Sequence, residues 1–282
     1  MEPLSLREAI ARHVRDGQSV ALEGFTHLIP FAAGHEIIRQ RRRELHLLRM
    51  TPDVISDQLI GMGCVRQLTF SWGGNPGVGS LHRLRDAVEH QWPSALSLIE
   101  RTHGEMAVAY QAGASGLPCG LMRRGAQTDL ATASAVRVRT VSCPFSGVAL
   151  TAVPAINPDV TILHAQQVDA GGNVLIRGIV GAAKEAAMAA RSLIVTVEEQ
   201  VERLEADINS VVLPSWIVTA VSIVPGGAYP SYAHGYYARD NQLYQAWEAI
   251  SRDRQSFNRW MQRHVIEAPG HEHHLKLLGV SA

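Results

Sequence analysis

Cysteine is scarce in this chain of 282 residues, which contains three: Cys64, Cys119 and Cys143. An odd, widely spaced set does not form a disulfide framework, and it lacks the close pairs of a structural zinc site. We therefore expect three small, buried hydrophobic side chains in a protein of the reducing cytoplasm.

Net charge is absent as well, because 26 Lys and Arg residues balance 26 Asp and Glu residues. This balance argues against nucleic acid or an anionic membrane as a partner, and it favours an oligomer by removing charge repulsion. The longest uncharged span, 140–158, contains three prolines and several hydroxyl residues, which excludes a membrane helix. Charged residues from Glu2 onward predict that there is no signal peptide.

The stretch from Asp159 to Val201 is the most informative part of what is present. Its pattern predicts a buried strand from Val160, a turn at 169–173, a short strand at 174–176, an Ala-rich helix at 182–190 and a strand at 192–197. Strand, turn, strand, helix, strand is the order typical of an open α/β sheet. Glu198 and Glu199 end this last strand, and because neighbouring strand residues point to opposite sides, we expect one of them to be a cap or an interface ion-pair partner.

Similar patterns predict a single α/β domain over residues 1–282, with an open, mostly parallel sheet flanked by helices. Further helices are expected at 6–14, 31–42, 81–91 and 104–114, and further strands at 20–22, 45–50, 67–72, 95–100 and 217–224. Residues 240–265 have the apolar spacing of one long C-terminal helix, and 266–282 have the composition of a polar, solvated tail. The histidines of this region lack Cys or acidic ligands at matching spacing, so we expect no metal site from them: His264, His271, His273 and His274.

Two glycine-containing loops follow predicted strands, at 23–27 (EGFTH) and 71–75 (SWGGN). Ligands of open α/β sheets bind at the carboxyl ends of the strands, so both loops are candidate binding loops. The helix from Pro30 would offer free N–H groups to an anion, and the consecutive glycines would let backbone amides converge beside the Ser71 hydroxyl. The alternative for both loops is a tight turn between strand and helix. The candidate substrate-binding residues are Glu23, Gly24, Phe25 and Thr26 in the first loop, and Ser71, Trp72, Gly73, Gly74 and Asn75 in the second.

Five segments together carry a resemblance to a known family. They are SVALEGFTHLIPFAA at 19–33, SWGGN at 71–75, HGEMAVAYQAGASGLPCGLMR at 103–123, the stretch 159–201 and PGGAYPSYAHGYY at 225–237. In this order they resemble the A (alpha) subunit of the class I coenzyme A transferases, closest to the glutaconate CoA-transferase A-subunit branch. Each motif alone is weakly specific, but the five cover nearly the whole chain.

Glu23 is the single residue with the most specific chemical interpretation, because a carboxylate at a strand end could attack a thioester. The resemblance instead implies that the catalytic Glu belongs to a B subunit, and that the A subunit usually carries a small residue here. Glu23 is thus open to three interpretations: a nucleophile or base, a residue that orients the substrate, or a structural cap of the loop.

Two further candidates are supported by both chemistry and the resemblance. His103 lies between a strand and a helix, where an imidazole can donate to a carboxylate or carry a proton, although a satisfied structural histidine is the alternative. Glu105 suits the positive end of that helix. The resemblance places Arg123 after the Leu-Pro strand, where its guanidinium could bind a free carboxylate, with Arg124 facing solvent.

The resemblance therefore implies an enzyme subunit that moves CoA from an acyl-CoA to a small carboxylic or dicarboxylic acid. The expected partner is a B-type subunit carrying a glutamyl-CoA thioester, and the tyrosine-rich loop at 225–237 would contribute to an interface. We expect a coenzyme A thioester as substrate, no permanently bound cofactor and a cytoplasmic location. Rivals are a hydrolase, lyase or decarboxylase subunit of the same fold, and a non-catalytic partner that only stabilises the B subunit.

Overall fold

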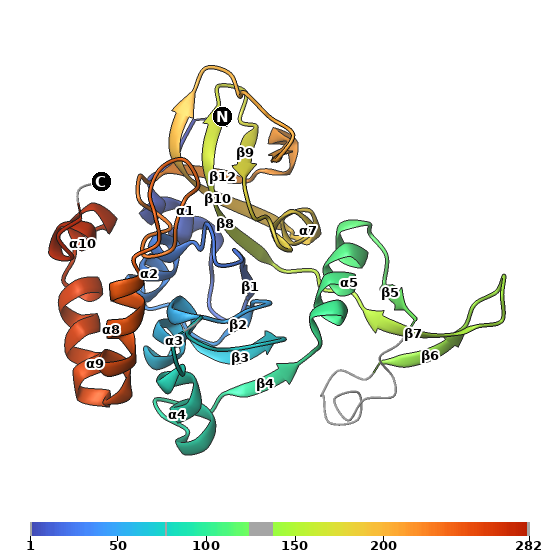
Figure 1. The fold of residues 1–282 in the computed structure, drawn as a ribbon, viewed down its shortest axis with the longest axis horizontal. Helices are drawn as coiled ribbons and strands as arrows, with labels where there is room; N and C mark the ends of the chain where they lie inside the picture. The colour runs from blue at the N-terminus through green and yellow to red at the C-terminus, as the bar shows by residue number, and fades with distance from the viewer. Residues whose placement is uncertain (1, 77, 124–137, 281–282) are drawn as a thin grey trace.

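The computed structural model describes residues 2–76, 78–123 and 138–280. A central nine-stranded sheet forms the body of the chain, and helices cover both of its faces (Figure 1). One face packs on helices α1 (Leu6–His13), α2 (Phe31–Arg39), α3 (Val54–Gly61) and α4 (His82–His90), and the other packs on α5 (His103–Ala114) and α7 (Ala183–Ala189). The predicted α/β architecture is confirmed.

The strand order explains why this sheet is mostly parallel. Strands β1 (Ser19–Leu22), β2 (Leu45–Leu48), β3 (Val65–Phe70) and β4 (Ser97–Glu100) pair in sequence order, and each pair is parallel. Strands β8 (Val160–Asp169), β10 (Ser192–Val201) and β12 (Ala220–Ile223) extend the sheet in the same direction. At the far edge β9 (Val174–Arg177) runs antiparallel to β8, and β11 (Ser210–Leu213) pairs antiparallel with β9.

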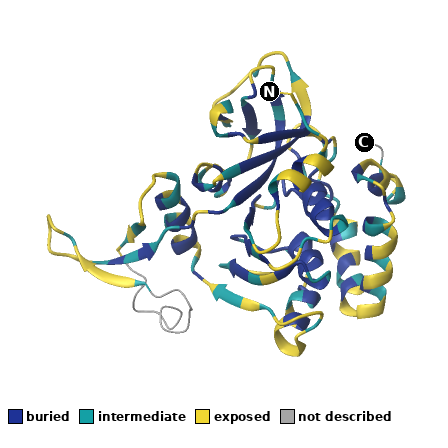
Figure 2. Cartoon of the chain, turned by 180° about the vertical axis from the view of Figure 1, so that it is seen from behind, coloured by how far each residue is buried: buried dark blue, intermediate teal, exposed yellow. Residues whose placement is uncertain are grey.

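Strand β8 joins the two halves of the sheet. Its first residues pair with β1, with Val20 opposite Val160, whereas its last residues pair with β9 after the turn at 169–173. That turn forms as predicted, because the Asp169 carboxylate accepts a hydrogen bond from the Asn173 backbone and Gly172 adopts φ +86°. Figure 2 shows the central strands as the buried part of the molecule.

A smaller antiparallel sheet projects from α5. It consists of β5 (Cys119–Met122), β7 (Ala149–Pro154) and β6 (Arg139–Ser142), in that order. Its hairpin extends away from the body, and Phe145 in the turn is 97% exposed (Figures 1 and 2). Cys64 is buried as expected, but Cys119 and Cys143, both in this projecting part, are only half-buried.

The C-terminal prediction was wrong in two respects. Residues 240–265 form two helices, α8 (Asn241–Arg252) and α9 (Arg254–Met261), followed by a π-helical turn, Gln262–Ile266. Asp253 separates them, because its backbone is extended and its carboxylate caps α9 at Ser256. In one straight helix Trp247 and Trp260 would lie about 20 Å apart; their rings instead meet at 5.2 Å, because the chain folds back and both helices bury an apolar face.

The described part of the predicted tail, residues 266–280, is not a solvated tail either. Residues His271–Leu277 form helix α10, whose His271 and His274 are buried. The two side chains lie on one helical face, because they are three residues apart. His274 packs its ring 4.5 Å from that of His35, and His271 hydrogen-bonds the Gly226 carbonyl at 2.8 Å. Polar composition misled the prediction because His271 and His274 each hydrogen-bond a backbone carbonyl inside the protein.

Among the described residues, no helix is both long and apolar enough to cross a membrane.

Candidate active site

Loops after β1, β2 and β3 meet the start of α5 at the carboxyl edge of the sheet and enclose a cavity of about 260 Å³. Its lining residues are Phe25, Thr26, Thr51, Asp53, Trp72, Pro76 and His103. Four of these were candidate site residues, and the structure brings them together from three separate loops. Phe25 and Trp72 are 37% and 46% exposed, so the cavity presents apolar surface to solvent.

A second cavity of about 570 Å³ adjoins the first at His103. It lies between α5 and the start of α7, and its lining also includes Met50, Gly104, Ala107, Gln111, Gly181, Ala182 and Glu185. A larger cavity of about 790 Å³ lies between α1, α2 and α10. None of the candidate binding residues and no residue of the loops after β1 to β4 lines that larger cavity, so the pair of cavities at His103 is the better candidate site.

Glu23 begins the first loop, but its side chain lines neither of the two cavities at His103. Its side chain is buried and accepts hydrogen bonds from the Met50 backbone at 3.0 Å and the Tyr110 hydroxyl at 2.9 Å. Burial raises the pKa of Glu23, although the nearby Arg49 guanidinium opposes the shift. Glu23 is not among the lining residues of either cavity, so the geometry favours the structural interpretation of this carboxylate.

Sequence reasoning missed Arg49, which organises the first loop. Its side chain is fully buried and donates to the carbonyls of Leu22 and Gly24, the latter at 3.1 Å. It also forms an ion pair of 3.1 Å with Asp53, on the floor of the smaller cavity. Burial raises the pKa of Asp53, whereas the charge of Arg49 lowers it. The only sequence signal was an Arg at the end of an apolar strand, followed four residues later by Asp.

The second glycine loop does not present converging amides, contrary to the prediction. The amides of Ser71 and Trp72 both donate to the Met50 carbonyl, and that of Gly74 donates to Pro52. The Ser71 hydroxyl also bonds to Met50, and buried Asn75 donates to the Tyr244 carbonyl. This loop is a tight structural turn that places Trp72 at the cavity, because the amides of Ser71, Trp72 and Gly74 and the Ser71 hydroxyl are bonded to backbone carbonyls.

The start of α2 is likewise no anion site. The amide of Phe31 donates to the Ile29 carbonyl. The amide of Ala32 donates to the carbonyl of Gly227, in the tyrosine-rich loop at 225–237, which we call the late loop. The sequence had suggested that the N–H groups here are free to bind an anion, but these two are already used in hydrogen bonds within the chain.

His103 occupies the first position of α5 and is exposed. Thr102 and Glu105 form a capping box, in which the Glu105 carboxylate accepts from the Thr102 amide at 2.9 Å. Glu105 thus has the structural role expected of it. Arg123 is exposed directly after β5 and is not among the lining residues of the two cavities, and Arg124 lies outside the described residues.

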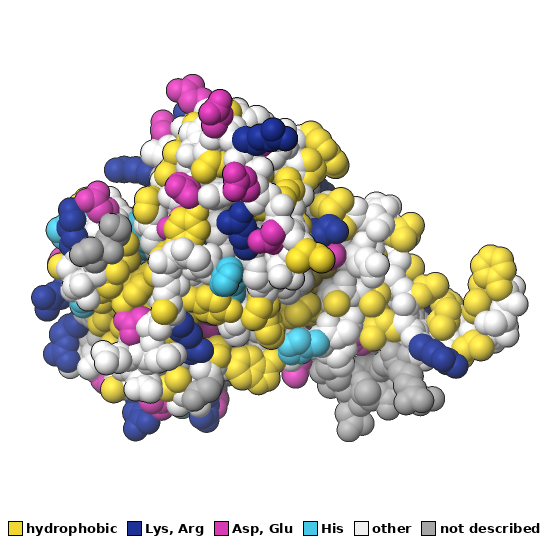
Figure 3. Space-filling view, turned by 45° about the horizontal axis from the view of Figure 1, so that its top comes forward, with side chains coloured by type: hydrophobic (Ala, Val, Ile, Leu, Met, Phe, Trp, Pro, Cys, Tyr) yellow, Lys and Arg dark blue, Asp and Glu magenta, His cyan; other side chains and the backbone are white. Residues whose placement is uncertain are grey.

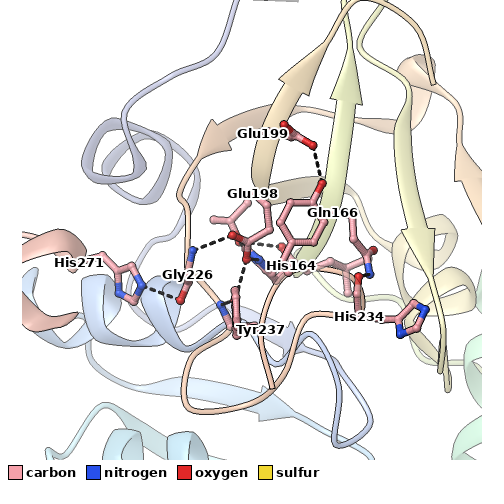
Figure 4. Close-up of polar contacts among 12 residues, drawn as sticks. His164, Gln166, Glu198, Glu199, Gly226, His234, Tyr237 and His271 are labelled. Atoms are coloured by element: carbon pink, nitrogen blue, oxygen red, sulfur yellow. Dashed lines mark hydrogen bonds and ion pairs between the residues drawn. The ribbon is translucent and has the colours of Figure 1, made fainter. Parts of the chain in front are cut away.

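Glu198 and Glu199 point to opposite sides, as predicted, but within β10 rather than at its end. Buried Glu198 accepts from the His164 ring at 2.6 Å, the Tyr237 hydroxyl at 2.6 Å and the Gly226 amide at 2.7 Å (Figure 4). Burial acts to raise the pKa of Glu198, but these hydrogen bonds and His164 outweigh it and lower the pKa. The cluster fastens the late loop to β8 and β10, so much of the tyrosine-rich loop is used within the chain.

No group of three His, Cys, Asp or Glu side chains within the described part of the chain is placed to hold a metal ion.

Comparison with known proteins gives consistent matches over most of the chain. The sequence model of the family described as Coenzyme A transferase matches residues 4–223. The A subunit of 3-oxoadipate CoA-transferase from Pseudomonas knackmussii is 59% identical, covering 94% of this chain and 93% of the relative. The A subunit of glutaconate CoA-transferase from Acidaminococcus fermentans is 30% identical, covering 99% of this chain and 92% of the relative.

Solved structures agree with these sequence matches. The crystal structure of glutaconate CoA-transferase from Acidaminococcus fermentans matches with a TM-score of 0.91 at 29% identity, covering 99% of this chain and 93% of the other. The structure of a decarboxylase, the AibA/AibB C56S variant, matches with a TM-score of 0.80 at 28% identity, covering 93% and 98%. The resemblance inferred from five motifs is confirmed.

Proposed function

Because the chain belongs to the coenzyme A transferase family, we propose that it is the A subunit of a heteromeric CoA transferase whose acid substrate is 3-oxoadipate or a similar dicarboxylic acid. The observation that carries the choice of acid is the 59% identity to a 3-oxoadipate CoA-transferase A subunit along almost the full length of both chains.

The smaller cavity is suited to the carbon chain of such an acid. Its volume of about 260 Å³ lies below the roughly 300–1,000 Å³ of sites for drug-sized ligands, which favours a small acid. Phe25 and Trp72 supply apolar walls, and Thr26 and His103 supply hydrogen-bonding groups. Arg123 would bind the free carboxylate as the acid approaches from the side of β5.

The covalent step is assigned to the partner subunit. A Glu carboxylate there would attack the acyl-CoA carbonyl and expel the CoA thiolate, which then attacks the glutamyl carbonyl and releases the first acid. The resulting glutamyl-CoA thioester passes CoA to the second acid by the reverse steps. Glu23 is a poor alternative nucleophile, because its buried carboxylate is held by Met50 and Tyr110.

A decarboxylase subunit is the second candidate, favoured by the match to a solved decarboxylase over 93% of this chain. The two activities differ in their products. A transferase conserves the thioester and needs an acceptor acid, whereas a decarboxylase releases CO₂ without one.

The test is to co-express the chain with a B-type chain and supply acyl-CoA donors with and without 3-oxoadipate. We expect formation of 3-oxoadipyl-CoA by the complex and none by either chain alone. Acid-independent release of CO₂ would favour the decarboxylase, and full transfer by this chain alone would contradict the division of labour.

A further inference from the structure

We infer that His27 is a positioning residue, whose imidazole ties the loop carrying Phe25 and Thr26 to the loop at 178–181 and so holds the walls of both cavities in place. The inference rests on the proposed function in that the cavities are taken as the acid-binding site. His27 does not line either cavity, so it acts through its neighbours.

The first loop has a backbone that needs external support. Thr26 and Leu28 adopt φ values of +58° and +52°, in the left-handed region that residues with a Cβ rarely occupy. A Cβ at Gly24 would lie 2.8 Å from the Leu28 carbonyl oxygen, so the loop closes tightly on itself. Such a conformation persists only where surrounding contacts determine it.

His27 supplies contacts with both ring nitrogens. The residue is 0% exposed, and its Nδ1 and Nε2 lie 3.1 Å from the Ile179 carbonyl oxygen and from the His234 backbone nitrogen, respectively. A backbone N–H can only donate, so Nε2 accepts from His234. The ring proton of the neutral imidazole is therefore on Nδ1, which donates to Ile179. Both nitrogens are used only when the ring is neutral.

The loop on the Ile179 side is shaped to receive this ring. Gly178 has φ +94°, and a Cβ there would lie 3.1 Å from the Cε1 atom of His27. At Gly181 a Cβ would lie 2.9 Å from the Cβ of Phe25, so the two loops touch directly. Gly181 lines the second cavity, of about 570 Å³, and Phe25 lines the smaller one, of about 260 Å³. The His27–Ile179 hydrogen bond thus joins a loop that lines the smaller cavity to a loop that lines the second cavity.

The loop on the His234 side is held in turn by the sheet. The Gln166 side chain on β8 donates to the His234 carbonyl at 3.3 Å, and both side chains are drawn in Figure 4. The same late loop bonds the first loop twice more, from the Ser231 hydroxyl to the Thr26 carbonyl at 2.9 Å and from the Leu28 amide to the Tyr232 carbonyl at 3.0 Å. His27 is the side chain that joins all three loops.

Four variants separate this role from simple structural support. His27→Leu removes both hydrogen bonds, and His27→Asn has a donor and an acceptor on a side chain too short to span them. His27→Gln retains a donor and an acceptor at a more suitable reach. His274→Leu is the matched control, because His274 is also buried, with its ring bonded to the His264 carbonyl at 2.7 Å, away from both cavities.

Two measurements are made on the complex with the B-type chain. By hydrogen exchange, peptides covering 23–30 and 176–182 should exchange at least about tenfold faster in His27→Leu and His27→Asn than in the wild type or His274→Leu. By kinetics, the same two variants should raise the KM for the acid at least about tenfold with a smaller change in kcat. His27→Gln should recover most of both properties.

Unchanged exchange in His27→Asn and His27→Leu, or an equal rise of KM in His274→Leu, would overturn the inference. If His27→Leu does not fold, His27→Asn and His27→Gln still decide it. A wild-type complex without transferase activity would count against the proposed function, while hydrogen exchange would still decide whether His27 holds the loops.

Discussion

At the scale of single residues, Glu23 has chemistry that suggests catalysis and surroundings that oppose it. We predict that Glu23 forms no covalent adduct, because its carboxylate is buried against Met50 and Tyr110. The complex would be incubated with acyl-CoA and trapped with borohydride or hydroxylamine, and the modified peptide would be located by mass spectrometry. Label should appear on the partner, also in Glu23→Gln; label on the peptide containing Glu23 alone would make this chain the catalytic subunit.

The buried contacts of Arg49 lead to a prediction about the stability of the fold. Arg49→Met leaves Asp53 as an unpaired buried carboxylate and removes the donor to the Leu22 and Gly24 carbonyls. Loss of one partner from a buried ion pair should lower the free energy of unfolding by about 3–5 kcal/mol. Urea unfolding measures this, with Arg85→Met as control, because its pair with Glu89 is exposed and should contribute less than about 1 kcal/mol. Equal effects of the two substitutions would argue against a structural role of Arg49.

The proposed role of Arg123 leads to a prediction about binding of the acid substrate. Its side chain is exposed, so Arg123→Ala should leave folding intact and mainly raise the KM for the acid. Loss of a charge-assisted hydrogen bond costs about 1.5–3 kcal/mol, equivalent to roughly 10- to 150-fold in affinity. Steady-state kinetics of the complex would show the effect, and exposed Arg191→Ala serves as control. Unaltered kinetics, or a large drop in melting temperature, would speak against this role.

At the scale of elements, the histidines of α10 should make the protein sensitive to acid. Burial lowers the pKa of His271 to about 3 and that of His274 to about 4. An unfolded histidine has a pKa near 6.5, so below this pH the unfolded chain binds protons that the folded chain excludes. Stability should therefore fall as pH drops from about 6.5 toward 4, by up to about 1.4 kcal/mol per pH unit for each group.

Urea unfolding at pH 7 and pH 5 tests this expectation. His274→Gln can still donate to the His264 carbonyl but does not titrate, so it should lose less stability between the two pH values than the wild type. The same pH dependence in both proteins would show that His274 is not responsible.

Elements were predicted best where their signals are local. The turn at 169–173 depends on residues a few positions apart, and it forms as expected. The break at Asp253 was missed because it depends on packing between α8 and α9, which the helical period of the sequence does not record. Helix α10 was missed for a related reason, since two of its three buried side chains are histidines.

The residues of the candidate site were also predicted only in part from the sequence. The rule that loops at carboxyl ends of parallel strands meet was sufficient to bring Phe25, Trp72 and His103 to one cavity. Arg49 could not be found this way, because its role depends on carbonyls from another strand. Nor could the hydrogen bonds that occupy the second glycine loop be seen in its composition.

At the scale of the whole molecule, we predict that this chain co-purifies with a B-type chain as a heterodimer or a dimer of heterodimers. The two relatives named above are A subunits, and the projecting hairpin carries exposed hydrophobic side chains, among them Val141, Phe145 and Val148. Figure 3 shows hydrophobic side chains on the surface of this projecting part. Light scattering after size-exclusion chromatography of the co-expressed chains gives the stoichiometry. Elution of the two chains as separate species at micromolar concentration would contradict the prediction.

The central position of β8 has a consequence for synthesis on the ribosome. Ser19 at the start of β1 and Asp159 just before β8 are 140 residues apart, yet they hydrogen-bond to each other. At about 5–20 residues per second, translation needs roughly 7–28 s to deliver β8 after β1. During that interval β1 to β4 can pair among themselves, but the other edge of β1 has no strand beside it. The nascent chain therefore carries an open sheet edge until more than half of it has been translated, and this is the period in which a chaperone would protect it most.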